Sequence, residues 1–401
     1  MTLLSKVGGF IQSHLKIAQA FPPFVHLART AFKIINRQTL IGIKDQVANI
    51  APTPDKFKLL VVVPPSWSAA NKGWGPGIGH FYYDIWKSAQ ERYGSKSVEY
   101  TELGADRRNW SKFVLNRIVD SKPTHIIFHA EEIPYDDLAQ FLKFGQGLNA
   151  CFSGALTLLM YDSIYWNHLF IAEAMNKVFD RTCILATDQF PRLAKVGAKT
   201  GPALLPTSLE SLRILDSDYC KDTQKPRYGT TIIGSVYGYR EKNLRRLSKL
   251  GLNVEVNPHK KPNSATKPSY QEFYSVLRNS KFTINFSRAN GATVKHAKTR
   301  LLEATLFGTI VATDERKITS LLLGEAEHIY FRNLRDLRNQ INKLNANPME
   351  YRSLLNRSRE GGERLRKAFW IAFEDISAHH FPQIPCPKEL ATERSSVEIG
   401  L

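Results

Sequence analysis

The sequence lacks the features of a membrane-spanning or secreted protein. No apolar run is long enough to cross a bilayer, and no compact apolar stretch near the N-terminus ends in a small-residue cleavage site. Cysteine is scarce, and the four that occur lie too far apart for a metal knuckle or a redox motif. We therefore expect a cytoplasmic protein, with a peripheral position on the inner face of the membrane as the alternative.

Acidic residues are also few. Asp and Glu number 37 against 55 Lys and Arg, which gives a formal net charge of +18. Such an excess favours anionic partners, among them nucleotide diphosphates, anionic lipid and acidic polysaccharide. Nucleic acid is the least favoured of these partners, because the sequence has no recognised binding module or aromatic-basic repeat.

The first 44 residues contain no acid, and apolar side chains recur in them at helical spacing beside Arg29, Lys33 and Arg37. Such a basic amphipathic pair of helices suits the surface of an anionic membrane. The alternative is that both helices simply pack on the body of the protein.

From residue 56 onward the pattern alternates between apolar strands and amphipathic helices, breaks at a polar stretch, and then alternates again. Continuous apolar strands between helices predict parallel sheets covered on both faces. We therefore predict an α/β protein with two Rossmann-like domains whose sheets face a cleft, closed by C-terminal helices. The predicted parts are N-terminal helices and linker (1–55), a first Rossmann-like, acceptor domain (56–220), a second, donor domain (225–361), a terminal helix packing back on the body (362–380) and a flexible tail (381–401).

The most informative segment runs from Ser280 to Asp314. It predicts a strand, a Gly-containing loop and then a helix that begins near Ala297, with Arg300 and Glu303 in its first turns. A helix start offers free N–H groups and a positive dipole end to a diphosphate. A carboxylate one turn further in can accept two hydrogen bonds from ribose hydroxyls. The alternative is a plain surface ion pair between the two side chains.

This region resembles the C-terminal domain of group 1 GT-B glycosyltransferases, in particular the spore-maturation-protein-like branch. The resemblance covers roughly residues 225 to 370, while the N-terminal half matches only in layout. The matching residues are Ile233-Gly234-Ser235, Tyr239-Arg240, Arg300, Leu302-Glu303-Ala304, Gly308, Thr313-Asp314, Ile329-Tyr330-Phe331 and Asn347-Pro348.

The resemblance implies a hexosyltransferase-type enzyme that uses a nucleotide-sugar donor, with no metal and no cofactor. Glu303 would then bind the donor ribose, and Arg240 with Arg300 would neutralise the diphosphate. The acceptor would be a polysaccharide, a lipid-linked glycan or another cell-envelope component. For Arg240 the alternative is membership of a solvated basic face with the cations that follow it.

The sequence departs from the family at one position. Many relatives carry a second Glu eight residues before the ribose one, where this chain has Lys295. Lys295 could instead hold phosphate, or His296 could take the contact with the donor sugar. The lost carboxylate also supports a second hypothesis, a non-catalytic clamp that binds nucleotide sugars without turnover.

The loop after the first predicted strand contains four glycines, of which Gly77 and Gly79 directly precede the next helix. Glycines here let backbone approach a substrate, although their spacing fails the dinucleotide fingerprint. His80, one turn from Asp84, could deprotonate an acceptor hydroxyl, or it could simply cap or pack the helix start. The rival bases, at the ends of other predicted strands, are Asp162, Asp188 and His129 with Glu131 and Glu132. The sequence predicts that Asp216 and Asp218 lie in a solvated turn of the linker rather than in a metal site.

Overall fold

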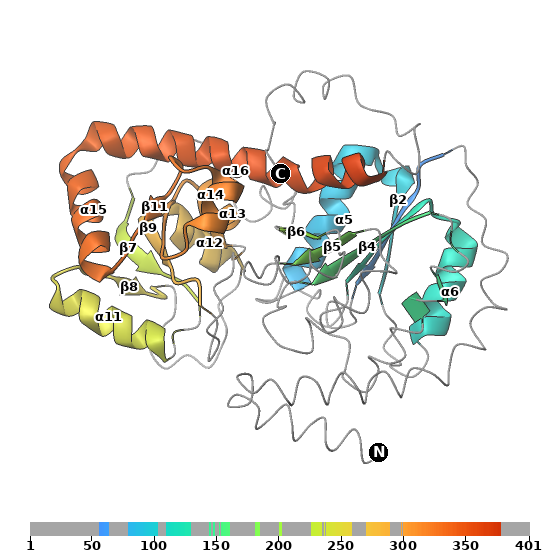
Figure 1. Ribbon diagram of the computed structural model, residues 1–401, viewed down its shortest axis with the longest axis horizontal. Coiled ribbons are helices and arrows are strands. Elements are labelled where there is room, and N and C mark those ends of the chain that lie inside the picture. The colour runs from blue at the N-terminus through green and yellow to red at the C-terminus, as the bar shows by residue number, and fades with distance from the viewer. Residues whose placement is uncertain are drawn as a thin grey trace, which may run out of the picture.

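The computed structural model describes two parallel sheets and the helices around them (Figure 1). The described residues are 56–63, 79–102, 110–129, 144–145, 147–148, 152, 154–160, 181–184, 200–202, 226–234, 236, 238–258, 270–288, 298 and 300–377. The predicted N-terminal helices and C-terminal tail lie outside these residues.

The first sheet has six parallel strands in the order β2-β1-β3-β4-β5-β6. Its centre forms because β1 consists of five apolar residues, each with no exposed surface. Helices α5 (Gly79–Tyr93) and α6 (Trp110–Ser121) lie beside it, and the 3-10 turn η3 (Ser95–Ser97) leads into β2. The strands are β1 (Leu59–Val63), β2 (Val98–Glu102), β3 (His125–His129), β4 (Ala155–Met160), β5 (Arg181–Ile184) and β6 (Thr200–Pro202).

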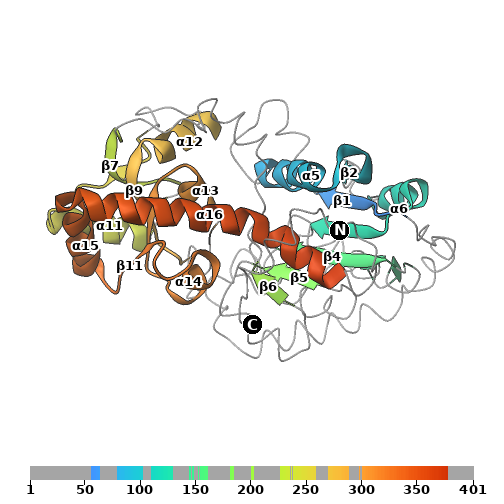
Figure 2. The same cartoon turned by 90° about the horizontal axis from the view of Figure 1, so that it is seen from above.

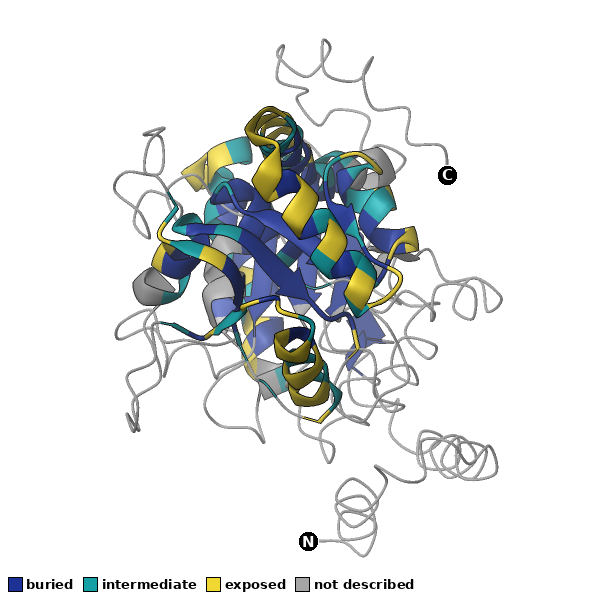
Figure 3. Ribbon diagram, turned by 90° about the vertical axis from the view of Figure 1, so that its left-hand side faces the viewer, coloured by how far each residue is buried: buried dark blue, intermediate teal, exposed yellow. Residues whose placement is uncertain are grey.

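The second sheet has five parallel strands in the order β11-β10-β9-β7-β8. Its buried strands lie among helices whose outer sides are exposed (Figure 3). The strands are β7 (Tyr228–Ile232), β8 (Glu255–Val256), β9 (Ser280–Asn285), β10 (Ile310–Thr313) and β11 (Ile329–Tyr330). The helices are α11 (Tyr239–Lys249), α12 (Tyr270–Arg278), α13 (Arg300–Leu306), α14 (Lys317–Leu323) and α15 (Leu334–Ala346).

One long helix, α16 (Pro348–Ser377), extends from the second sheet to the first (Figure 2). Near its middle, Gly362 packs so closely on α13 that an added Cβ would lie 2.6 Å from the Thr305 hydroxyl. At its far end, Trp370 donates a hydrogen bond to the Ser88 hydroxyl of α5 at 3.1 Å. Helix α16 continues through residues 361 and 362, where the sequence predicted the end of the donor domain and the start of a terminal helix. The domain limits stay predictions.

The alternating pattern predicted the fold class correctly, since α/β architecture with parallel sheets is confirmed. Three of the described elements were not predicted: the 3-10 turn η3, β6 and α14. β6 is three residues long and contains Gly and Pro, which gives no strand signal. Helix α14 begins where the Glu315 carboxylate accepts the backbone N–H groups of Ile318 and Thr319 at 3.0 to 3.2 Å.

No helix among the described residues is both long enough and apolar enough to cross a membrane.

Candidate functional site

The candidate site lies at the carboxyl edge of the second sheet, where strand order reverses. Numbered from β7, the five strands have the order 2-1-3-4-5, so the chain leaves β7 in one direction and β9 in the other. Open α/β folds bind ligands at such a point, outside the carboxyl ends of the strands. Ile233 and Gly234 directly follow β7 here, and α13 follows the connection from β9.

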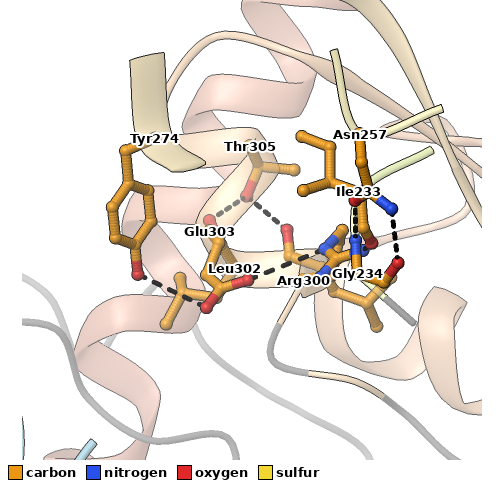
Figure 4. Close-up of polar contacts among 9 residues, drawn as sticks. Ile233, Gly234, Asn257, Tyr274, Arg300, Leu302, Glu303 and Thr305 are labelled. Carbon is orange, nitrogen blue, oxygen red and sulfur yellow. Dashed lines mark hydrogen bonds and ion pairs between the residues drawn. The ribbon is translucent and has the colours of Figure 1, made fainter. Parts of the chain in front are cut away.

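Arg300, the first residue of α13, points back at the end of β7 (Figure 4). Its Nη1 donates a hydrogen bond to the Ile233 carbonyl, and its guanidinium lies 5.2 Å from the ring centre of Phe273. Gly234 has a φ of 105°, and a Cβ there would lie 3.3 Å from Arg300 Nη2. A larger residue at 234 would therefore crowd the guanidinium as well as strain the backbone.

Glu303 lies one turn further along α13 and is 8% exposed. Its Oε2 is 3.8 Å from Arg300 Nε, and its Oε1 accepts a hydrogen bond from the Tyr274 hydroxyl at 3.3 Å. Burial raises the pKa of Glu303, although Arg300 and Tyr274 act in the opposite direction. Burial likewise lowers the pKa of Arg300 despite the attraction of Glu303. Glu303 is thus buried and Arg300 is largely buried, so the pair is less exposed than an ordinary ion pair on a helix surface.

Arg240 follows the β7 loop at the start of α11, and its Nη2 donates to the Arg288 carbonyl at 3.2 Å. The Tyr239 hydroxyl donates to the same carbonyl at 2.9 Å, and burial raises the pKa of Tyr239 to about 12. Arg240 is close enough to Arg300 for its charge to contribute to the lowered pKa of Arg300. Arg240 is half-buried, whereas Lys242, Arg245 and Arg246 are exposed, so it differs from the solvated basic face that follows it.

Asn257 is a site residue that the sequence analysis missed. Its Oδ1 accepts the Gly234 N–H at 2.7 Å, and its Nδ2 donates to the Gly234 carbonyl at 2.9 Å (Figure 4). Its position in the sequence could have indicated this role, because Asn257 directly follows β8. A polar side chain directly after a parallel strand lies at the ligand-binding edge of the sheet. Its φ of 45° also suits Asn better than most residues.

The other predicted site residues are not placed. Ser235, Lys295, His296, Gly77 and Asp162 lie outside the described residues, and α5 begins at Gly79, but the His80 side chain is not described. Their roles stay predictions. Within the described ranges, no group of three or more His, Cys, Asp and Glu side chains is arranged to hold a metal ion.

Comparison with known proteins places this site within a matched region. Residues 220–369 match the model of a family described as glycosyl transferase-like. A search of curated proteins finds no match to the chain.

Several solved structures are similar. A sucrose-phosphate synthase from Thermosynechococcus elongatus superposes with a TM-score of 0.54 and 10% identity, over 81% of this chain and 100% of that one. An α-glucosyltransferase in complex with UDP-glucose and DNA has a TM-score of 0.48 and 11% identity, and the match covers 80% of this chain and 99% of that one. Anabaena Alr3699/HepE in complex with UDP has a TM-score of 0.45 and 11% identity, and the match covers 85% of this chain and 100% of that one. The chain has an α/β fold with parallel sheets that matches GT-B glycosyltransferases.

Proposed function

We propose that the protein is a glycosyltransferase that takes its sugar from a nucleotide-sugar donor. One observation carries the proposal. Arg300 and Glu303 form a buried pair at the switch point of the second sheet, inside the segment that matches the glycosyl transferase-like family. A buried cation and carboxylate at such an edge suit a ligand that presents both phosphate and hydroxyl groups.

The chemistry assigns a role to each charge. The Glu303 carboxylate accepts hydrogen bonds from the donor ribose, for which an ionised acceptor is well suited. Arg240 and Arg300 stabilise the negative charge that develops on the departing nucleoside diphosphate. In the reaction the bond from the anomeric carbon to the diphosphate oxygen breaks, the acceptor oxygen bonds to that carbon, and a base takes the acceptor proton.

The base comes from the first domain. His80 is the leading candidate because it follows Gly79 at the start of α5, and Asp162 is its rival. Gly77 and Gly79 allow the preceding loop to approach the substrate, while Ser235, Lys295 and His296 complete the contacts with phosphate and sugar. The acceptor is a polysaccharide, lipid-linked or other cell-envelope glycan, reached in the cytoplasm or at the inner face of the membrane.

The ribose assignment is tested with matched nucleotides. We expect the wild-type protein to bind the best of UDP, GDP, ADP and CDP more tightly than its 2′,3′-dideoxy counterpart, because only the former offers both ribose hydroxyls. Glu303→Gln keeps the shape and removes the charge, so this preference falls roughly ten-fold, the value of about 1.5 kcal/mol for a hydrogen bond to a charged group. Calorimetric titration measures both affinities.

Glu241→Gln is the control, since Glu241 is exposed and pairs with Arg245 on α11. It should leave the preference unchanged. An equal preference for the ribonucleotide over the dideoxynucleotide in the wild type and in Glu303→Gln would show that Glu303 does not bind the ribose.

Transfer itself is tested with the nucleotide sugars of the tightest-binding base. Release of nucleoside diphosphate that depends on a glycan acceptor supports the enzyme, and His80→Gln is expected to abolish release while leaving donor affinity intact. Donor binding without transfer to any acceptor would favour the non-catalytic clamp instead.

A further inference from the structure

We infer that Asn257 is a positioning residue that holds the Arg300 guanidinium in place through a single peptide group. The inference deepens the proposed function and rests on it for the identity of the ligand. The peptide concerned joins Ile233 to Gly234 at the end of β7. Asn257 binds its N–H from one side, and Arg300 donates to its carbonyl from the other (Figure 4).

The fixed end of this chain of hydrogen bonds is Asn257. Its own N–H donates to the Ile232 carbonyl at 2.9 Å, which ties it to the last residue of β7. Its side chain then makes two hydrogen bonds with Gly234, as acceptor from the N–H and as donor to the carbonyl. Two bonds to one residue fix both the position and the orientation of the carboxamide.

The Gly234 backbone has a conformation that residues with a side chain rarely adopt. Its φ of 105° is left-handed, and Asn257 is left-handed as well at 45°. For a residue other than glycine, such as Asn257, a left-handed conformation persists where surrounding contacts over-determine it, and such residues cluster at ligand sites. Since the Gly234 N–H is already used by Asn257, this glycine acts by allowing the close approach of the guanidinium rather than by donating to a ligand.

The chain of contacts continues from Arg300 to the carboxylate. Hydrogen bonds polarise one another through a peptide group, so the Asn257 contact strengthens the carbonyl that Arg300 binds. Arg300 in turn faces Glu303, which Tyr274 holds from the other side. Asn257 therefore sets where the positive charge lies, although it does not touch the proposed ligand.

The test is the variant Asn257→Asp, measured at two pH values. A carboxylate can accept the Gly234 N–H but cannot donate to the Gly234 carbonyl, and it repels that oxygen. A protonated acid can do both, as the amide does. Because burial and the facing Gly234 carbonyl both favour the protonated acid, part of the acid is protonated at pH 5. We expect the affinity for the tightest-binding nucleoside diphosphate of the panel to fall at least ten-fold at pH 8, relative to the wild type at the same pH, and the loss to be smaller at pH 5.

Asn253→Asp is the matched control, because Asn253 is exposed, lies on the same connection and undergoes the same chemical change. It should stay within two-fold of the wild type at both pH values. Hydrogen exchange distinguishes local loosening in Asn257→Asp from a loss of folding. We expect amide exchange to accelerate in the segment 228–236 while β9 stays protected.

The two proposals fail in different ways. If the wild type binds no nucleoside diphosphate, the proposed function fails, and hydrogen exchange still tests the role of Asn257. Unchanged exchange in segment 228–236, or an affinity loss that is the same at pH 5 and pH 8, would overturn the inference.

Discussion

Two buried ion pairs lie in different regions of the protein, and they are built differently. At the junction of α5 and α16, Arg92 grips Glu374 with two hydrogen bonds, one of them 2.8 Å long, and Tyr93 adds a third at 2.9 Å. At the edge of the second sheet, Arg300 and Glu303 are 3.8 Å apart, and Arg300 Nε has no hydrogen-bond partner among the described residues.

The pKa values of the two arginines move in opposite directions. Burial alone would lower the pKa of Arg92, but the hydrogen bond and charge of Glu374 raise it overall. For Arg300, burial prevails and its pKa is lowered. The first pair is fully hydrogen-bonded at the joint between two helices, whereas the second leaves the buried Arg300 Nε donor without a hydrogen-bond partner among the described residues. This difference agrees with the proposal that the second pair contacts a ligand, while the first pair holds α5 and α16 together.

The largest effect is expected for Arg300→Met, which leaves Glu303 buried without its cation. We expect the free energy of unfolding to fall by about 3 to 5 kcal/mol at neutral pH, measured by urea denaturation. The double variant Arg300→Met/Glu303→Leu should recover much of this loss, because it removes both charges and keeps the volume.

The same variant has a predictable pH dependence. A carboxyl whose pKa is raised in the folded state binds more protons in the folded than in the unfolded protein. The free energy of unfolding therefore falls as the pH rises from 4.5, the ordinary pKa of Glu, through the raised pKa of Glu303. Without Arg300 the pKa of Glu303 rises further. The loss in Arg300→Met should therefore be smaller at pH 5 than at pH 8, and an equal loss would show that Glu303 is not the group left unpaired.

The second expected effect is that of Glu374→Gln, which keeps the shape and removes the charge that Arg92 binds. We expect a loss of about 2 to 3 kcal/mol in the free energy of unfolding, with the affinity for nucleoside diphosphate unchanged. Glu363→Gln on the same helix is the control, because its pair with Arg366 is partly exposed and contributes less than about 1 kcal/mol. A large loss of affinity in Glu374→Gln would break the distinction between the two pairs.

Close packing of α16 on α13 gives a third, smaller expectation. In Gly362→Ala the new Cβ meets the Thr305 side chain at 2.6 Å, so α16 must shift, and we expect a loss of about 1 to 3 kcal/mol. Gly229→Ala, where nothing lies within 4 Å of the added Cβ, is expected to change stability by less than about 0.5 kcal/mol. Equal thermal shifts in the two variants would contradict the packing argument.

Sequence reasoning grouped one part of the candidate site and missed another for physical reasons. Arg300 and Glu303 were predictable because helical spacing and the family resemblance both mark the first turns of α13. Asn257 was not, because its role depends on a contact with Gly234 that is 23 residues away and on two left-handed backbone conformations. The strand order was not predictable from periodicity alone, so the switch point that unites them emerged only from the pairing of β7 with β9.

The smallest effect separates Arg240 from the basic face that follows it on α11. Arg245 is 76% exposed and pairs with exposed Glu241, so Arg245→Gln is expected to change stability by less than about 0.5 kcal/mol and leave ligand affinity unaltered. Arg240→Gln removes a half-buried cation near Arg300, and the affinity for nucleoside diphosphate should fall roughly five-fold, about 1 kcal/mol for a charge that solvent partly screens. The affinity for the free nucleoside should stay the same, because it carries no phosphate. Titration of both ligands into both variants measures these affinities. Equal losses of affinity for nucleoside diphosphate in Arg240→Gln and Arg245→Gln would show that Arg240 acts as part of the solvated basic face.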